Sequence, residues 1–110
     1  MNRITFTTPK GEGYIAEFDR DICASMEERK LTPDQALAMP ASKLLLFFHW
    51  AFKKNQPKAS KDVTDEIWKG LPAEGKKQVL ETLAKYWEEA RDTLMDEPED
   101  DSKKVMWEIG

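Results

Sequence analysis

The sequence predicts a mainly α-helical single domain with a small N-terminal β-hairpin, an α+β fold. Residues 44–52 read LLLFFHWAF, an apolar run that other elements must cover. Residues 73–95 carry apolar side chains at every third or fourth position, the periodicity of an amphipathic helix. Residues 3–18 contain two β-prone runs separated by a turn. With 110 residues in total, we expect one compact helical domain over residues 1–95, followed by an acidic flexible tail over residues 96–110.

The hairpin is predicted from alternation at the N-terminus. Ile4 and Phe6 alternate with threonines, and the run TyrIleAlaGluPhe begins at Tyr14. The segment between them, ProLysGlyGluGly, has the composition of a turn, so we expect strands near residues 2–8 and 13–18. A lone two-stranded hairpin is marginal in water, so its apolar face must lie against helices. We expect that face to contain Ile4, Phe6, Ile15 and Phe18.

Two short helices are expected before the apolar run. Asp19 can cap a helix over residues 20–30, with Ile22, Cys23 and Met26 facing inward. The sequence ThrProAspGln from Thr32 combines an N-cap threonine, a proline at the first helical position and a glutamine at the third, which is the pattern of a capping box. Pro40 then ends this second helix and can open the next one.

The apolar run favours a helix over a strand, because no Gly or Pro interrupts residues 41–56. It is much shorter than the roughly 20 apolar residues that a bilayer requires, so we expect a central helix and no membrane anchor. After a polar loop, Ser60 is expected to cap a helix over residues 61–69 that Gly70 closes. The last helix, over residues 73–95, has the apolar stripe Val79, Leu83, Tyr86, Ala90 and Leu94, widened by Leu80 and Trp87.

Charge and composition argue against several classes of function. The net charge is −4, and residues 56–110 alone hold 9 basic and 14 acidic residues, a net of −5. Such an acidic half lacks the electrostatic footprint of a nucleic-acid-binding domain. The N-terminus has no apolar signal segment, and one cysteine builds no disulfide framework, so we expect a cytoplasmic protein.

No residue pattern indicates catalysis, a metal or a cofactor. His49 is the only histidine and has no orienting partner in sequence, and Cys23 has no adjacent base. Gly11 and Gly13 lack the third glycine and the following helix of a phosphate-binding loop. The acidic block at residues 96–101 lacks the glycine and the ligand spacing of a calcium loop. We therefore expect no enzyme activity, no cofactor and no metal.

Two regions are candidates for binding a protein partner. Trp107 and Ile109 lie in an apolar end, ValMetTrpGluIle, beyond the acidic block, and tryptophan is enriched at interface hot spots. This end has three alternatives: it docks back on the domain as a short strand, it anchors a partner, or it is disordered. The second region is a face of the central helix at Phe48, His49 and Phe52, which would form the floor of a binding site if the wrapping leaves it open.

The order of landmarks resembles the tail assembly chaperones of long-tailed bacteriophages and prophages. The resemblance covers nearly the whole chain and includes the hairpin followed by EFDRDICASMEE, PASKLLLFFHWAF, KDVTDEIWKGLP, LETLAKYWEEARDTLMDE and the terminal VMWE. It rests on this ordered set, because no single motif is diagnostic.

The resemblance implies a protein without enzyme activity, made in the cytoplasm of an infected or lysogenic bacterium and absent from the mature virion. It further implies binding to the tape measure protein and recruitment of tail tube subunits, and a longer frameshifted product is common in such families. Self-association is left open. The alternative function is a small helical prophage adaptor or regulatory protein that sequesters a host factor.

Overall fold

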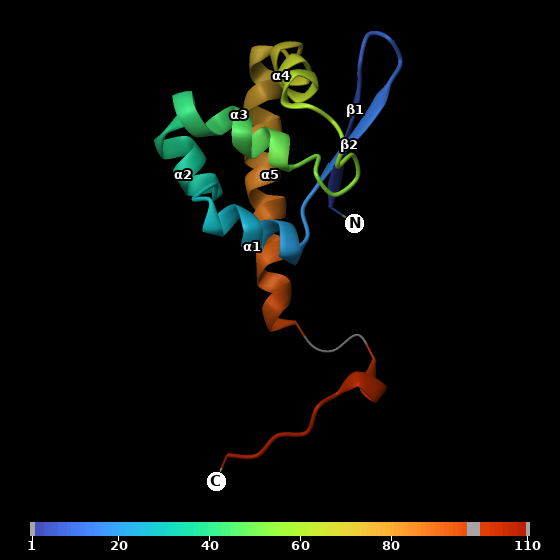
Figure 1. Ribbon diagram of the computed structural model, residues 1–110, viewed down its shortest axis with the longest axis vertical. Helices are drawn as coiled ribbons and strands as arrows, with labels where there is room; N and C mark the ends of the chain where they lie inside the picture. The colour runs from blue at the N-terminus through green and yellow to red at the C-terminus, as the bar shows by residue number, and fades with distance from the viewer. Residues whose placement is uncertain (1, 97–99, 110) are drawn as a thin grey trace.

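The computed structural model describes residues 2–96 and 100–109, and it confirms the predicted fold class. A hairpin is followed by five α-helices in the described part of the chain, and the last helix runs the length of the domain (Figure 1). The elements are β1 (Arg3–Thr7), β2 (Gly13–Glu17), α1 (Arg20–Glu28), α2 (Pro33–Ala38), α3 (Pro40–Trp50), α4 (Lys61–Lys69), α5 (Ala73–Asp92) and the short 3-10 helices η1 (Thr93–Met95) and η2 (Asp101–Lys103).

The two strands pair antiparallel, with Ile4 opposite Ala16 and Phe6 opposite Tyr14. Directly opposed residues share one face of a sheet. The inner face therefore contains Ile4, Phe6, Tyr14 and Ala16, and Phe18 continues it into the core. The prediction was wrong for Ile15, which lies opposite Thr5 on the other face, because side chains alternate and one step in register exchanges the faces.

The outer edge of β2 is covered by the chain that follows α3. The backbone N–H of Ile15 donates to Gln56 Oε1 at 2.7 Å, and Gln56 Nε2 donates to the Ile15 carbonyl at 2.9 Å. One residue pair further along, the N–H of Glu17 donates to the Ala51 carbonyl at 2.8 Å. The Gln56 side chain thus takes the place of a third strand along β2.

The helix starts follow the predicted capping chemistry. The Asp19 carboxylate accepts from the Ile22 N–H at 2.8 Å, and Thr32 and Gln35 form the reciprocal capping box. Helix α1 ends at Glu28, two residues earlier than predicted. Lys30 follows with φ +56, a left-handed conformation that ends the helix and redirects the chain toward α2.

Helix α3 begins at Pro40 as predicted but ends at Trp50. The next residues form turns, in which the N–H of Phe52 bonds to the His49 carbonyl three residues back. Sequence continuity without Gly or Pro favoured helix to residue 56. The Ala51 carbonyl is instead used by β2, so a tertiary hydrogen bond overrides local propensity.

The last two helices occupy nearly the predicted ranges. Ser60 caps α4, and its hydroxyl accepts from the Val63 N–H. Helix α5 ends at Asp92, and the 3-10 turn of η1 completes the predicted span to Met95. Leu94 was predicted on the buried stripe, but 69% of it is exposed because it lies beyond the end of α5, where no element covers it among the described residues.

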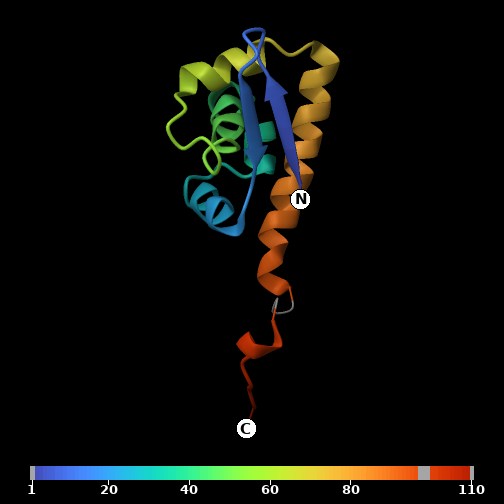
Figure 2. The same cartoon turned by 90° about the vertical axis from the view of Figure 1, so that its right-hand side faces the viewer.

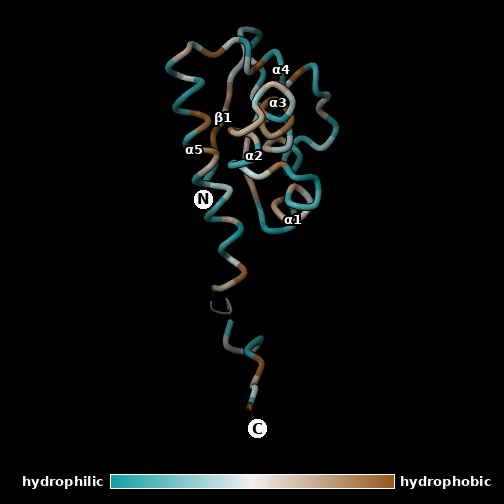
Figure 3. Tube along the Cα trace, turned by 90° about the vertical axis from the view of Figure 1, so that its left-hand side faces the viewer, coloured by the Kyte–Doolittle hydropathy of each residue, from teal (hydrophilic) through white to brown (hydrophobic). Residues whose placement is uncertain are grey.

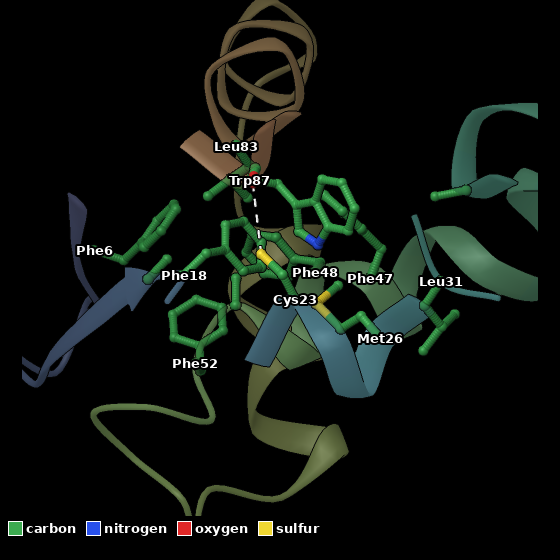
Figure 4. Packing of buried hydrophobic residues seen from close by; sticks show 13 residues of the cluster. Phe6, Phe18, Cys23, Met26, Leu31, Phe47, Phe48, Phe52, Leu83 and Trp87 are labelled. Atoms are coloured by element: carbon green, nitrogen blue, oxygen red, sulfur yellow. Dashed lines mark hydrogen bonds between the residues drawn. The ribbon is translucent and has the colours of Figure 1, made fainter. Parts of the chain in front are cut away.

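The core lies where the hairpin, α1, α3 and α5 meet (Figures 2 and 4). Phe48 is its centre: its ring centroid lies 5.7 Å from that of Phe6, 5.0 Å from Phe52 and 5.1 Å from Trp68, each near edge-to-face. From α1 and α5, Cys23 and Trp87 meet through a hydrogen bond from Cys23 Sγ to the Trp87 carbonyl, drawn as the dashed line in Figure 4. The largest fully buried side chains are Trp87, Phe47, Phe48, Phe52, Met26, Leu83, Thr64 and Cys23.

We predict that Phe47→Ala lowers the free energy of unfolding by about 3 to 5 kcal/mol, because Phe47 is completely buried and its removal leaves a cavity. Trp50→Ala should cost clearly less, because Trp50 is only half-buried at the end of α3. Urea unfolding at neutral pH measures both. Equal losses for the two variants would contradict this description of the core.

Candidate protein-interaction site

The predicted binding face on the central helix is closed. Phe48 and Phe52 are each 1% exposed and His49 is 9% exposed. The aromatic rings of Phe6 and Trp68 cover Phe48, and α4 covers His49 through Thr64. The prediction that these three residues form the floor of a client site is therefore wrong for this structure, because the hairpin and α4 cover this face of α3.

His49 is a buried hydrogen-bonding residue. Its Nδ1 lies 2.9 Å from the Thr64 hydroxyl, and that hydroxyl donates its proton to the Lys61 carbonyl at 3.0 Å. Because a hydroxyl has one proton, His49 Nδ1 must be the donor in its own contact. Burial, together with the nearby Lys53 and Lys61 charges, lowers the pKa of His49, so the ring is neutral at pH 7.

Cys23 is packed in the core against α5. Burial, with the charges of Asp19 and Glu27, raises the pKa of its thiol to about 12. A thiol with that pKa is almost entirely protonated at neutral pH, and only 1% of the residue is exposed. Cys23 therefore acts as an apolar packing residue.

The described residues hold no group of three or more His, Cys, Asp or Glu side chains arranged to bind a metal ion. Among the helices in residues 2–96 and 100–109, none is both long and apolar enough to cross a membrane.

Trp50 is a half-exposed side chain at the end of α3. The Arg29 guanidinium lies 4.8 Å from its ring centroid and the Lys53 ammonium 5.2 Å from it. These distances are those of cation–π contacts. The two cations shield the indole from solvent, so Trp50 offers little free apolar surface to a partner.

Four large, highly exposed apolar side chains lie close together in sequence near the C-terminus. Val105, Met106, Trp107 and Ile109 are 79%, 86%, 78% and 86% exposed. The backbone here is neither helix nor strand, and it extends from the end of α5 away from the domain, where hydrophobic stretches are visible in Figure 3. We call residues 104–109 the C-terminal segment. Of the predicted site residues, Trp107 and Ile109 lie in it, far along the chain from Phe48, His49 and Phe52.

Val105 and Met106 were not predicted as separate site residues, although they belong to the same apolar run. Leu37 and Met39, each 54% exposed near the junction of α2 and α3, were not predicted either. No periodic pattern marks this pair, because α2 is only six residues long. The C-terminal segment is therefore the most extensive exposed apolar feature of the described residues.

Comparisons with known proteins place the chain in a family. The family described as Domain of unknown function (DUF5055) matches residues 1–110. The chain belongs to this family. Neither a search of curated proteins nor a search of solved structures found a match.

We predict that the stability of the protein falls as the pH drops below about 6.5, in part because of His49. The pKa of His49 is lower in the folded protein than its ordinary value of 6.5, so the unfolded chain binds more protons in this range and acid favours unfolding. His49→Asn is the matched control, since an Asn amide can still donate to Thr64 but does not titrate. Melting temperatures between pH 5 and pH 8 should fall more steeply for the wild type. Parallel pH profiles would contradict the assignment.

Proposed function

We propose that this protein is a tail assembly chaperone of a long-tailed bacteriophage or prophage, which binds the tape measure protein and helps to recruit tail tube subunits. The proposal rests on the landmark order described above and on one structural observation: a run of large apolar side chains, each more than three-quarters exposed, at the end of a folded domain. An exposed apolar run of this kind is unusual on a monomeric protein and commonly marks a binding site.

The C-terminal segment suits an apolar, helical client. Val105, Trp107 and Ile109 offer anchors that can enter a groove between client side chains, and tryptophan is the residue most enriched among interface hot spots. The acidic residues that precede the segment in sequence and the net charge of −4 keep the chaperone soluble while its anchors are exposed. This division lets the folded domain and the binding segment act separately.

No part of the proposed role requires a reactive group. The buried histidine is hydrogen-bonded and neutral, and the cysteine thiol is protonated at neutral pH. Chaperone action here consists of covering apolar client surface until the tail tube assembles around it. Accordingly, the proposed location is the bacterial cytoplasm, and the proposed chaperone leaves before the virion matures.

We predict that truncation after Met95 leaves the domain folded but abolishes binding to the tape measure protein encoded beside it. Trp107→Ala in the full chain should weaken binding about 10-fold or more, because a buried interface tryptophan is commonly worth 2 kcal/mol or more. Lys104→Ala, in the same segment but without an apolar anchor, is the matched control. Calorimetric titration of each variant with purified tape measure fragments measures the effect.

Full binding by the truncated chain would exclude the C-terminal segment as the client site. Gene context is an independent check, since the gene should lie between a tail tube gene and a long tape measure gene. Co-purification with a host protein, without tape measure or tube protein, would instead favour the adaptor function.

A further inference from the structure

The two outer edges of the hairpin differ in their hydrogen bonding: the edge of β2 is bonded to other parts of the chain, and the edge of β1 is not bonded to any described residue. Three hydrogen bonds establish which backbone groups point outward: Ile15 and Glu17 of β2 bond away from β1, and the N–H of Thr8 donates inward to the Glu12 carbonyl at 2.9 Å. Along an antiparallel pair the inward and outward residues alternate. Ile4 and Phe6 therefore bond to β2, and the N–H and C=O groups of Arg3, Thr5 and Thr7 point away from it.

The outward edge of β1 is open. Within the described residues, no backbone or side-chain hydrogen bond reaches the outward groups of Arg3, Thr5 and Thr7, and β2 is the only element with which β1 makes extensive backbone contact. Arg3 is the one charged residue of this short strand, which has no Pro, no Lys and no bulge. The contrast with β2, whose outer edge is filled by Gln56 and Ala51, makes the open edge of β1 a site for strand addition.

We propose that the C-terminal segment of a second copy of this chain adds to this edge as a third, antiparallel strand. Within the described residues, neither the C-terminal segment nor the outer edge of β1 is paired with another strand. The C-terminal segment is non-helical and exposed, and the edge of β1 has free backbone donors and acceptors. The inference does not depend on the proposed client, because it concerns only how two copies of the chain associate.

One antiparallel register matches the two sequences on both faces. With Glu108 opposite Arg3, Met106 lies opposite Thr5 and Lys104 opposite Thr7, and these three pairs form the hydrogen bonds. Trp107 then lies opposite Ile4, and Val105 lies opposite Phe6, on the inner face. Ile4 is only half-buried at present, so Trp107 would cover apolar surface that the hairpin leaves open.

Charge supports the same register. Arg3 makes no ion pair with any described residue: Glu17, opposite it in the hairpin, is bonded to Lys54 and Asn55. Glu108 on the incoming strand would sit on the free side of Arg3. A parallel arrangement that keeps Val105 and Trp107 against the same two residues pairs Val105 with Ile4 and Trp107 with Phe6. It places Lys104 beside Arg3, a like-charge contact that is unfavourable.

The geometry favours a second copy over the same chain. Asn2 is hydrogen-bonded to Glu89, and β1 runs from there away from the end of α5 (Figure 2). To lie antiparallel to β1, the same chain must extend about 25 Å from Met95 to the level of Thr7 before it reverses. The link from Met95 to Lys104, with three residues in the compact η2 turn, spans at most about 26 Å and leaves no length for the reversal. Two copies that exchange segments form a closed symmetric dimer instead.

The test combines sedimentation equilibrium with amide hydrogen exchange on the full chain over a wide range of concentrations. We expect a monomer–dimer equilibrium and protection of the Arg3, Thr5 and Thr7 amides that increases with concentration. Thr5→Pro should abolish both, because it removes an outward donor and no hairpin bond, a substitution that an edge strand tolerates. Thr5→Val keeps the N–H and is the matched control, expected to dimerise like the wild type.

A second set of variants leaves the hairpin untouched. Met106→Pro removes the N–H that faces Thr5 and should abolish dimerisation, whereas Met106→Val should retain it. Glu108→Lys should weaken the dimer about two- to five-fold, and much less so in an Arg3→Gln background, if the two side chains are opposite each other. These variants decide the question even if Thr5→Pro fails to fold.

Three results would overturn the proposal. The first is a chain that stays monomeric with unprotected outward amides at the highest concentration. The second is protection that depends on the C-terminal segment but not on concentration, which would mean addition within one chain. The third is a dimer that survives Met106→Pro, which would mean that two β1 strands pair with each other.

Discussion

The ring contacts of Phe48 hold the parts of this fold together. Phe6 comes from the hairpin, Phe52 from the turn after α3, and Trp68 from α4, and all three lie within 6 Å of Phe48 by ring centroid. A two-stranded hairpin has too little buried surface to be stable in isolation. Its inner face is stable here because α3 supplies an aromatic surface for it to cover.

The same packing explains why Phe48, His49 and Phe52 offer no open surface to a partner. A helix that is apolar on every side needs cover from several elements, and the hairpin, α4 and α5 bury Phe47, Phe48 and His49. Leu44, Leu45, Leu46 and Trp50 of the same helix stay half-buried. Wrapping α3 uses the apolar stripes of the other helices, and the proposed binding site lies instead at the C-terminal segment, whose apolar side chains are exposed. The consequence is a separation between a folded domain, which contains the buried histidine and cysteine, and an exposed segment that carries Trp107.

Two candidate occupants then compete for that segment. A client would bind Val105, Trp107 and Ile109 by their side chains, whereas the edge of β1 would bind the same segment by its backbone. The two are mutually exclusive if Trp107 is covered in both. Self-association of this kind protects the apolar anchors while no client is present, and it is reversible because only a few strand pairs must open.

The sequence by itself determined the elements and most of their starts. Local chemistry decides these: Asp19, Thr32 and Ser60 cap helices with their own side chains, and the stripe of α5 follows from its periodicity. Trp107 and Ile109 were recognisable as candidates for partner binding because an acidic block separates them from the domain, but docking back on the domain remained an alternative, and only the structure showed their exposure.

Only the tertiary structure decided the face of Ile15, the end of α3 and the closure of the surface at Phe48. Each depends on a partner distant in sequence: the strand register, the bond from Glu17 to Ala51, and the rings of Phe6 and Trp68. A sequence pattern shows that a residue needs a partner, but burial and hydrogen bonding depend on which partner the fold brings to it. The open edge of β1 likewise depends on the tertiary structure, because Gln56 covers the edge of β2 and no described residue bonds to the outward groups of β1.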